Sequence, residues 1–172
     1  MCKLHQVTIV GLGLIGGSIA RALRLRCPDV ILVAINRDDL GAHPDVGSTI
    51  DHFVTLANVA TCRTLISKSD IIVLCQPVRV IVESLSDYVS PNTVVTDTGS
   101  TKRQIVAKAR SLPGQEWFVP GHPMAGREVG GFENSAPELF ENRPWILCTE
   151  GREPTAVRKV EMLLEHLGAR KS

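Results

Sequence analysis

A glycine-rich turn near the start of the chain constrains the fold more than any other feature of the sequence. It follows the β-branched run Val7–Val10 and leads into a helical pattern over Ile15–Arg26, whose apolar residues recur on one face. In such a unit the first glycine permits the tight turn, the second lets the backbone approach a pyrophosphate, and the third allows helix and strand to pack closely. The sequence therefore predicts a dinucleotide site, with the phosphates at the helix N-terminus, formed by Gly11, Leu12, Gly13, Leu14, Ile15 and Gly16. A tight strand-to-helix turn that binds no ligand is the alternative.

Strand-like and helix-like segments alternate along the rest of the chain. Apolar runs predict strands at Val30–Ile35, Ile71–Cys75, Thr93–Thr96, Trp117–Val119 and Pro144–Cys148. Helical patterns cover Val78–Tyr88, Lys102–Arg110 and a last segment with Pro154 in its first turn and Gly168 as its C-cap. The polar segment Asn36–Asn58 gives no clear pattern. The alternation predicts an α/β fold, a Rossmann-type doubly wound and mainly parallel sheet with helices on both faces, in one domain over residues 1–172.

The composition is that of a compact domain with a sizeable core. The 172 residues are 44% hydrophobic and 22% charged, and their net charge of +1 gives no basic footprint for nucleic acid or an anionic membrane. The apolar run Val7–Ala20 is too short to span a bilayer and is broken by glycines. Five cysteines without a CxxC pair favour reduced thiols over disulfides or a zinc site. We expect a cytoplasmic protein without a signal peptide or a metal ion.

The end of the second predicted strand carries the choice of cofactor. NAD enzymes place a carboxylate there to hold the ribose 2′-hydroxyl. This chain has Asn36 followed by Arg37, which removes a charge that would repel a 2′-phosphate and supplies a cation that can pair with it. The pattern favours NADP over NAD. Two alternatives stay open: Asp38 or Asp39 acts as the ribose carboxylate, or Arg37 is a solvated loop residue.

A proline follows the predicted strand Ile71–Cys75, in the sequence Cys75-Gln76-Pro77. The carboxyl edge of an open parallel sheet is where ligands bind, so these residues are expected to line the nicotinamide side of the cleft. A proline-terminated strand with a buried cysteine explains them nearly as well. Cys75 has no evident basic partner near it in the sequence that would stabilise a thiolate, so a nucleophilic role for its thiol is not favoured.

Two later loops offer groups that can do chemistry beside a cofactor. The first, residues 97–102, reads DTGSTK and provides Ser100 and Lys102. The second, residues 121–128, reads GHPMAGRE and places His122 between glycine and proline after a predicted strand. Imidazole suits a general base because it titrates near working pH. The other four histidines lie at the N-terminus, in the polar segment or on the last helix. A structural, loop-bracing role is the alternative for His122.

These motifs together resemble the prephenate/arogenate dehydrogenases of tyrosine biosynthesis. The matching stretches are GLGLIGGS from Gly11, DTGSTK from Asp97, GHPMAGRE from Gly121, and Leu139-Phe140 followed by the PWIL at Pro144. The His-Pro-Met-Ala-Gly motif is quite specific to that family, and the resemblance covers essentially the whole chain. It implies an oxidative decarboxylation: hydride leaves the ring carbinol for the nicotinamide, carbon dioxide departs, and the ring aromatises.

The resemblance also implies roles for individual residues. His122 is the base on the ring hydroxyl, and Ser100 hydrogen-bonds the same hydroxyl or orients His122. Lys102 steadies its loop or the cofactor, or is only a surface lysine. Asp97 caps the turn that follows it rather than acting as an acid, and with Gly99 and Lys102 it is assigned to the cofactor edge. Glu128 is a weaker candidate for contact with substrate at the mouth of the cleft.

Members of the family continue into an all-helical domain that forms the dimer and contributes an arginine for a substrate carboxylate. We expect that domain to be absent from this chain, which should then fold, bind NADP, remain mostly monomeric and be a poor dehydrogenase alone. Two other functions stay open. One is another NADP-dependent reductase of the β-hydroxyacid or pyrroline-carboxylate type, which would not need His122. The other is an NADP-binding protein without catalytic activity.

Overall fold

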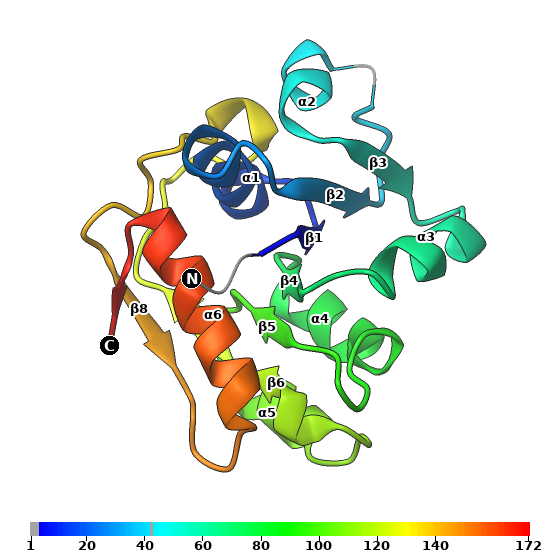
Figure 1. Ribbon diagram of the computed structural model, residues 1–172, viewed down its shortest axis with the longest axis vertical. Coiled ribbons are helices and arrows are strands. Elements are labelled where there is room, and N and C mark those ends of the chain that lie inside the picture. Colours follow the sequence, from blue (N-terminus) through cyan, green and yellow to red (C-terminus); the bar gives the residue numbers. More distant parts are fainter. Residues whose placement is uncertain (1–3, 42) are drawn as a thin grey trace.

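A parallel sheet of six strands forms the centre of the computed structural model, which describes residues 4–41 and 43–172 (Figure 1). The strand order is β3-β2-β1-β4-β5-β6, so the direction of winding reverses between β1 and β4. Ligands of open α/β sheets bind beside the carboxyl ends of the strands at such a reversal. The strands are β1 (Gln6–Val10), β2 (Ile31–Asn36), β3 (His52–Thr55), β4 (Ile71–Leu74), β5 (Val95–Asp97) and β6 (Phe118–Val119).

Successive residues of each central strand point to opposite faces of this sheet, and helices cover both faces. Ile9 packs into the cluster that contains α1 and α6, whereas its neighbour Val10 packs into the cluster that contains α4 and α5. The helices are α1 (Leu14–Arg26), α2 (Pro44–Thr49), α3 (Val59–Ile66), α4 (Val78–Ser84), α5 (Arg103–Ala109) and α6 (Pro154–Leu167). Short 3₁₀ turns occupy Leu85–Asp87, Gln115–Trp117 and Phe132–Asn134.

A second, smaller sheet lies at the other end of the molecule from β3 and was not predicted (Figure 1). It consists of β7 (Gly121–Pro123), β8 (Pro144–Leu147) and β9 (Arg170–Lys171). β7 runs antiparallel to β8, and β9 runs parallel to β8. Trp145 anchors this sheet to the main core: it is 1% exposed, and its ring centroid lies 5.2 Å from that of Phe140.

The predicted fold class is confirmed, and the predicted elements differ from the observed ones mainly at their ends. The helix expected over Val78–Tyr88 changes to a 3₁₀ turn after Ser84, and the strand expected from Thr93 begins at Val95. α6 begins at Pro154, and its C-cap Gly168 has a φ of 71°, as predicted. The polar segment that gave no pattern contains α2 and β3. Four cysteines are free, namely Cys27, Cys62, Cys75 and Cys148, and Cys2 lies outside the described residues.

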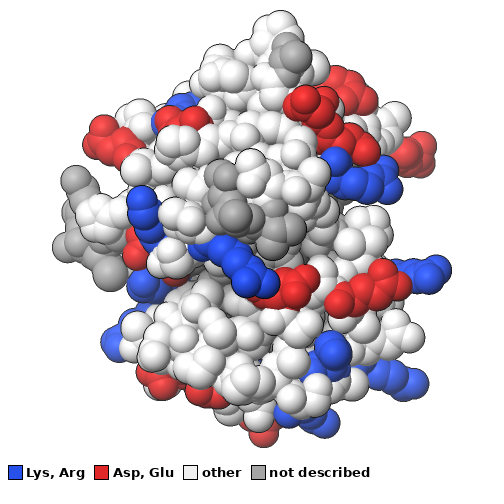
Figure 2. Space-filling model, turned by 90° about the vertical axis from the view of Figure 1, so that its right-hand side faces the viewer, with Lys and Arg blue, Asp and Glu red and all other residues white. Residues whose placement is uncertain are grey.

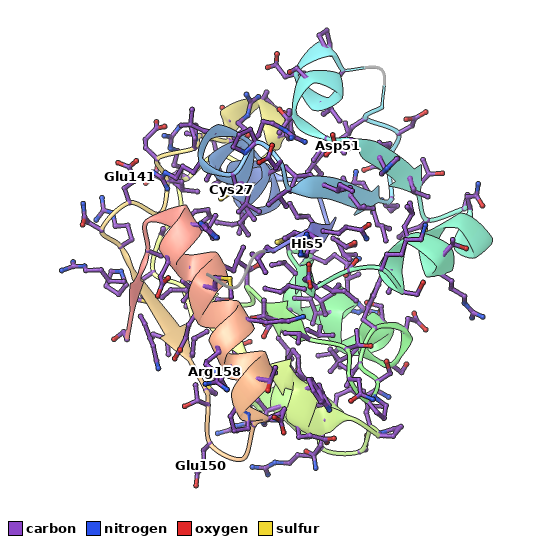
Figure 3. All side chains as sticks on the ribbon, viewed as in Figure 1. His5, Cys27, Asp51, Glu141, Glu150 and Arg158 are labelled. Atoms are coloured by element: carbon purple, nitrogen blue, oxygen red, sulfur yellow. The ribbon has the colours of Figure 1, made fainter. Side chains whose placement is uncertain are left out.

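Asp51, labelled in Figure 3, explains why the polar segment folds back onto the sheet. Its carboxylate accepts a hydrogen bond from the Leu32 N–H at 2.7 Å and pairs with Arg24 of α1. Burial raises the pKa of this carboxyl, but the Leu32 N–H and Arg24 lower it further, so that the net pKa is lowered. A single side chain thus ties the turn after α2 to both β2 and α1.

Charges on the surface are mixed. On the face shown in Figure 2, Lys and Arg lie interspersed with Asp and Glu rather than gathering into a patch of one sign. In the part of the chain that the structure describes, no helix is long and apolar enough to cross a bilayer.

Candidate active site

The turns that follow β1, β4 and β5 meet at one edge of the sheet. Backbone hydrogen bonds join each turn to its neighbour: Gly11 N–H to Ile35 O (2.8 Å), Cys75 N–H to Val10 O (2.7 Å) and Thr98 N–H to Leu74 O (3.0 Å). This edge is the one at which the winding of the sheet reverses. The glycine turn, Cys75-Gln76-Pro77 and the loop of Ser100 are therefore brought together as the sequence predicted.

Each glycine of the turn has a distinct environment. Gly11 has a φ of +98°, and a Cβ built on it would lie 3.0 Å from the backbone of Cys75. A Cβ on Gly16 would lie 2.1 Å from the Gly11 carbonyl oxygen, so helix and turn touch directly. A Cβ on Gly13 would meet nothing within 4 Å. The first and third glycines are thus required by packing, while the second faces open space.

The N-terminus of α1 can receive an anion. Gly13 is its N-cap and provides no side-chain hydrogen bond, and no acidic residue lies in the first turn. The positive partial charge of the N–H groups in the first turn of the helix is therefore not neutralised by a side chain. Together with the open space at Gly13, this arrangement fits the pyrophosphate of a dinucleotide.

A pocket of about 440 Å³ adjoins the glycine turn. Eight of the residues predicted to bind the cofactor line it: Gly11, Leu12, Gly13, Asn36, Arg37, Cys75, Gln76 and Pro77. The opposite wall is formed by Gly131, Phe132 and Glu133, and apolar side chains of Leu40, Leu56 and Val80 contribute the rest with Asp38. The sequence gave no signal for this wall, because the segment after the His122 motif reaches α1 only through tertiary folding.

Phe132 shows how that wall is held. The guanidinium carbon of Arg21 lies 4.7 Å from the centroid of the Phe132 ring, and the His43 ring meets it edge-on at 5.7 Å. Arg21 also donates a hydrogen bond to Ser135, and the Ala136 N–H donates one to Ser18 of α1. The 3₁₀ turn over Phe132–Asn134 is thereby fixed to α1 beside the pocket.

Asn36 and Arg37 occupy different positions at the pocket. The Asn36 side chain accepts a hydrogen bond from the Leu12 N–H at 3.0 Å, so it braces the glycine turn. Arg37 forms a bidentate salt bridge with Asp38, in which the Arg37 Nε lies 3.0 Å from the Asp38 Oδ1. This hydrogen-bonded pair raises the pKa of Arg37 and lowers that of Asp38. Both side chains are largely exposed at the pocket's edge.

Cys75 is unsuited to nucleophilic chemistry. Burial is the main cause that raises the pKa of its thiol to about 12; a hydrogen bond with Thr98 opposes the shift, and the negative charge of Asp97 adds a smaller increase. The reactive species of a cysteine is its thiolate, which is then scarce at neutral pH. The interpretation of Cys75 as a residue that lines the cleft fits this environment.

Asp97, at the end of β5, is fully buried and organises the loop that follows. One carboxylate oxygen accepts hydrogen bonds from the Gly99 N–H (2.9 Å) and the Lys102 ammonium, and the other accepts from the Gly121 N–H (3.2 Å). The first contact is the turn cap that the sequence predicted. Lys102 is an ion-pair partner rather than a surface lysine, and Asp97, Gly99 and Lys102 are not among the residues that line the 440 Å³ pocket.

His122 lies on β7 and is half-buried. Its Nδ1 is 3.3 Å from the Thr98 carbonyl oxygen, in the loop that carries Ser100. A carbonyl can only accept, so this contact requires a proton on Nδ1; in a neutral imidazole the Nε2 lone pair is then free. Ser100 is exposed and lies two residues after Thr98. Glu128 is exposed in the loop after β7, and within the described residues no hydrogen bond or ion pair joins it to His122 or Ser100.

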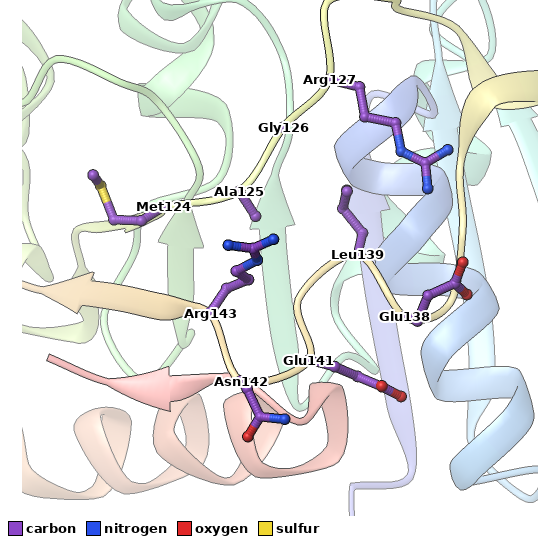
Figure 4. Close-up of a pocket in the computed structure, with 9 residues that line it drawn as sticks. All are labelled: Met124, Ala125, Gly126, Arg127, Glu138, Leu139, Glu141, Asn142 and Arg143. Carbon is purple, nitrogen blue, oxygen red and sulfur yellow. The ribbon is translucent and has the colours of Figure 1, made fainter.

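A second cavity, of about 530 Å³, begins directly after the His122 strand (Figure 4). Residues from two segments line it: Met124, Ala125, Gly126 and Arg127, and Glu138, Leu139, Glu141, Asn142 and Arg143. Arg143 extends toward Ala125 from the turn before β8 (Figure 4). The sequence did not predict this cavity. Among residues 4–41 and 43–172, no three side chains of His, Cys, Asp or Glu are grouped to hold a metal ion.

Comparison with known proteins places these features in one family. The family model described as "Prephenate dehydrogenase, nucleotide-binding domain" matches residues 19–172. A curated cyclohexadienyl dehydrogenase from Zymomonas mobilis is 28% identical over 99% of this chain and 58% of its own length.

Two solved structures are similar to this chain in three dimensions. Prephenate dehydrogenase from Aquifex aeolicus in complex with hydroxyphenyl propionate and NAD⁺ has a TM-score of 0.86 at 29% identity, over 99% of this chain and 60% of its own. Synechocystis arogenate dehydrogenase has a TM-score of 0.77 at 30% identity, over 97% of this chain and 58% of its own. The chain thus spans less than two thirds of the length of each of these three proteins.

Proposed function

This chain belongs to the prephenate dehydrogenase family, and we propose that it supplies the cofactor site and the catalytic base for oxidative decarboxylation of prephenate or arogenate. Such a reaction removes hydride from the ring carbinol while the ring carboxylate leaves as carbon dioxide. The chain must therefore hold a dinucleotide next to a base that accepts the proton of the ring hydroxyl. A dehydrogenase of tyrosine biosynthesis in the cytoplasm is the role we assign to it.

The contact between His122 and the Thr98 carbonyl carries this proposal. It leaves the Nε2 lone pair free to accept the proton of the substrate hydroxyl as hydride leaves the same carbon. Ser100, from the loop that holds the imidazole, hydrogen-bonds that hydroxyl or orients His122, and Glu128 contacts substrate at the cleft mouth.

The chain's residues hold the cofactor along the carboxyl edge of the sheet. When bound, the nicotinamide accepts the hydride. The N–H groups at the start of α1 bind the pyrophosphate, and Cys75-Gln76-Pro77 lines the nicotinamide side. We propose NADP over NAD, because Arg37 at the edge of the pocket can exchange its Asp38 partner for a 2′-phosphate. NAD, with Asp38 or Asp39 on the ribose, is the alternative.

We further propose that residues 1–172 are one dinucleotide-binding domain and that substrate binding is completed by a helical, dimer-forming domain of the kind that the family resemblance implies. Exposed apolar side chains on β8 and in the loop after β7 support a docking role for this part of the chain: Ile146, paired with His122, is 42% exposed, and Met124 and Val129 are each 52% exposed. Such side chains on a separate domain favour association with another surface. Alone, these 172 residues are then monomeric or weakly associating.

Steady-state turnover tests the proposal. The 172-residue chain is assayed with prephenate and arogenate, each with NADP and NAD, next to the variant His122→Asn and a dinucleotide titration of both proteins. We expect slow turnover that requires His122, and equal dinucleotide affinity in parent and variant. A β-hydroxyacid is assayed in parallel, and its turnover, unaffected by His122→Asn, would assign the chain to the other reductase class. Dinucleotide binding without turnover of any substrate would favour a non-catalytic binding protein.

A further inference from the structure

Asp97 stands out among the buried polar residues of the described chain because it alone is charged. It lies where the pairing of β5 with β6 ends, one residue after the Thr96–Val119 pair. Beyond this point the chain after β6 leaves the main sheet and enters β7. A buried carboxylate is costly unless several donors satisfy it, so its position at this divergence requires an explanation.

The carboxylate links two segments that backbone pairing does not join. It accepts from Gly99 and Lys102 on its own loop and from Gly121 at the start of β7. A side chain at either glycine would crowd this approach. A Cβ on Gly99 would lie 3.0 Å from the Asp97 carboxylate, and a Cβ on Gly121 would lie 3.0 Å from the Asp97 carbonyl oxygen.

His122 is held through this link. Asp97 bonds Gly121, and the next residue on each segment forms the contact between the Thr98 carbonyl and the His122 Nδ1. Two consecutive residues of the loop thus face two consecutive residues of β7. A change in the first contact displaces the acceptor that keeps the proton of His122 on Nδ1.

Lys102 opposes protonation of the buried carboxylate. Burial is the largest effect, so the pKa of Asp97 is raised and that of Lys102 is lowered, while the charge of each partner opposes the shift of the other. An ionised Asp97 can accept hydrogen bonds with both oxygens, whereas a protonated one must use one oxygen as a donor. Without Lys102, the buried carboxyl takes up a proton more readily, and its contact with Gly121 or Gly99 is weakened.

We propose that Asp97 and Lys102 are positioning residues, whose ion pair sets the Thr98 carbonyl against His122 and so fixes the tautomer with a free Nε2. The inference rests on the proposed function for its importance to turnover, but its structural content is independent of that function. The sequence predicts that Lys102 steadies its loop or the cofactor. In this proposal Lys102 does not contact the cofactor and acts on His122 only through Asp97.

Nitrogen-15 NMR of histidine side chains tests the tautomer directly. The labelled 172-residue chain is compared with Lys102→Met and with Arg103→Met, a matched control that removes the neighbouring exposed cation. His122 signals are assigned by their loss in His122→Asn. We expect Nδ1–H in the parent and the control. In Lys102→Met we expect a mixture of tautomers, and Lys102→Arg should recover the parent pattern.

Dinucleotide affinity and turnover complete the test. In Lys102→Met, affinity should stay within about twofold of the parent, while kcat falls about 10- to 100-fold at little-changed KM because the base is misplaced. If affinity instead falls tenfold or more and the His122 signals are unchanged, Lys102 is a cofactor ligand and the proposal is overturned. Should the parent show no turnover, the proposed function fails, and the NMR comparison still decides the positioning role. Asp97→Asn, of equal size, gives a second variant in case Lys102→Met does not fold.

Discussion

The glycine turn and the His122 strand lie at the same edge of the molecule, yet they are fixed in different ways. Gly11 and Gly16 touch each other across five residues of sequence, and the backbone of the turn is joined to β2 and β4 by ladder-like hydrogen bonds. His122 lies outside the six-stranded sheet, and its contact with Thr98 spans 24 residues.

This difference predicts how each region responds to change. The glycine turn depends on the absence of side chains and on backbone pairing, so only substitutions that add volume should disturb it. The His122 strand depends on one buried carboxylate and its partners, so it should be sensitive to the loss of a charge. The cofactor site is therefore expected to survive many changes that remove catalysis.

The largest effect is expected from His122→Asn. In whatever assembly is active, turnover should fall about 10²–10⁴-fold, the usual range for loss of a general base, while dinucleotide affinity stays nearly unchanged. Steady-state kinetics and a dinucleotide titration measure the two quantities. Parental turnover in this variant would show that His122 has a structural role and that the His122 strand is not the catalytic region.

Gly16→Ala should break the other region. Its added methyl would lie 2.1 Å from the Gly11 carbonyl oxygen, so turn and helix must move apart. We expect a loss of about 3 kcal/mol in the free energy of unfolding and a large loss of dinucleotide affinity. Gly47→Ala in α2 is the matched control, since its Cβ meets nothing within 4 Å, and it should change stability by less than about 1 kcal/mol. Urea unfolding of both variants checks the contrast. Equal stabilities would show that the turn is not held by packing.

Arg37→Ala sharpens the comparison within the cofactor site. It removes the cation at the edge of the pocket without touching the glycine turn. NADP affinity should fall roughly 10- to 100-fold, the effect of losing a charge-assisted pair to the 2′-phosphate, whereas NAD affinity should hardly change. Titration of both cofactors into both proteins measures this. An equal loss for the two cofactors, or tighter NAD binding by the parent, would contradict the choice of NADP.

The smallest effect concerns Asp70, at the opposite edge of the sheet from both regions. Its carboxylate accepts from the N–H groups of His5 (2.7 Å) and Gln6 (3.2 Å) and pairs with Lys159 of α6. Burial raises its pKa, but these three donors lower it more, so the folded pKa lies below the unfolded one. The stability it contributes is then present above the unfolded pKa of about 3.9 and is lost as pH falls through the folded pKa.

Asp70→Asn should accordingly cost about 1 kcal/mol of unfolding free energy at pH 7. The difference from the parent should persist to about pH 5 and shrink below about pH 4. Asp29→Asn, at an exposed turn before β2, is the control and should change the unfolding free energy at pH 7 by less than about 0.5 kcal/mol. Thermal unfolding at several pH values measures both. A difference that grows toward acid pH would reverse the sign of this argument.

Much of the fold followed from local patterns. The glycine turn, the apolar runs of β1, β2 and β4 and the capped α6 each have a signal within a few residues, because strand burial and helix caps are local properties. The segment that contains α2 and β3 lacked such a signal. β3 is an edge strand of four residues with one buried side chain, so it carries no apolar run to detect.

The candidate site likewise has parts that the sequence predicted and parts that it did not. Motif spacing predicted Gly11, Asn36, Ser100 and His122 as site residues, since each follows closely after a predicted strand. The pocket wall at Phe132 and the arginine-lined cavity at Arg143 had no comparable signal. They arise where a long loop folds back onto α1 and β7, and such contacts depend on which distant surfaces the loop meets.

The sequence by itself determined the strand–turn–helix unit, the alternation that builds the parallel sheet, and the residue types available at its carboxyl edge. These follow from steric limits on glycine and from the burial of apolar runs, which act over short distances along the chain. Only the tertiary structure decided that Asp97 would join Lys102 to Gly121, and that His122 would turn Nδ1 toward Thr98. A buried charge takes its partners from whatever donors the packed chain brings within reach, and the residues near it in sequence do not specify them.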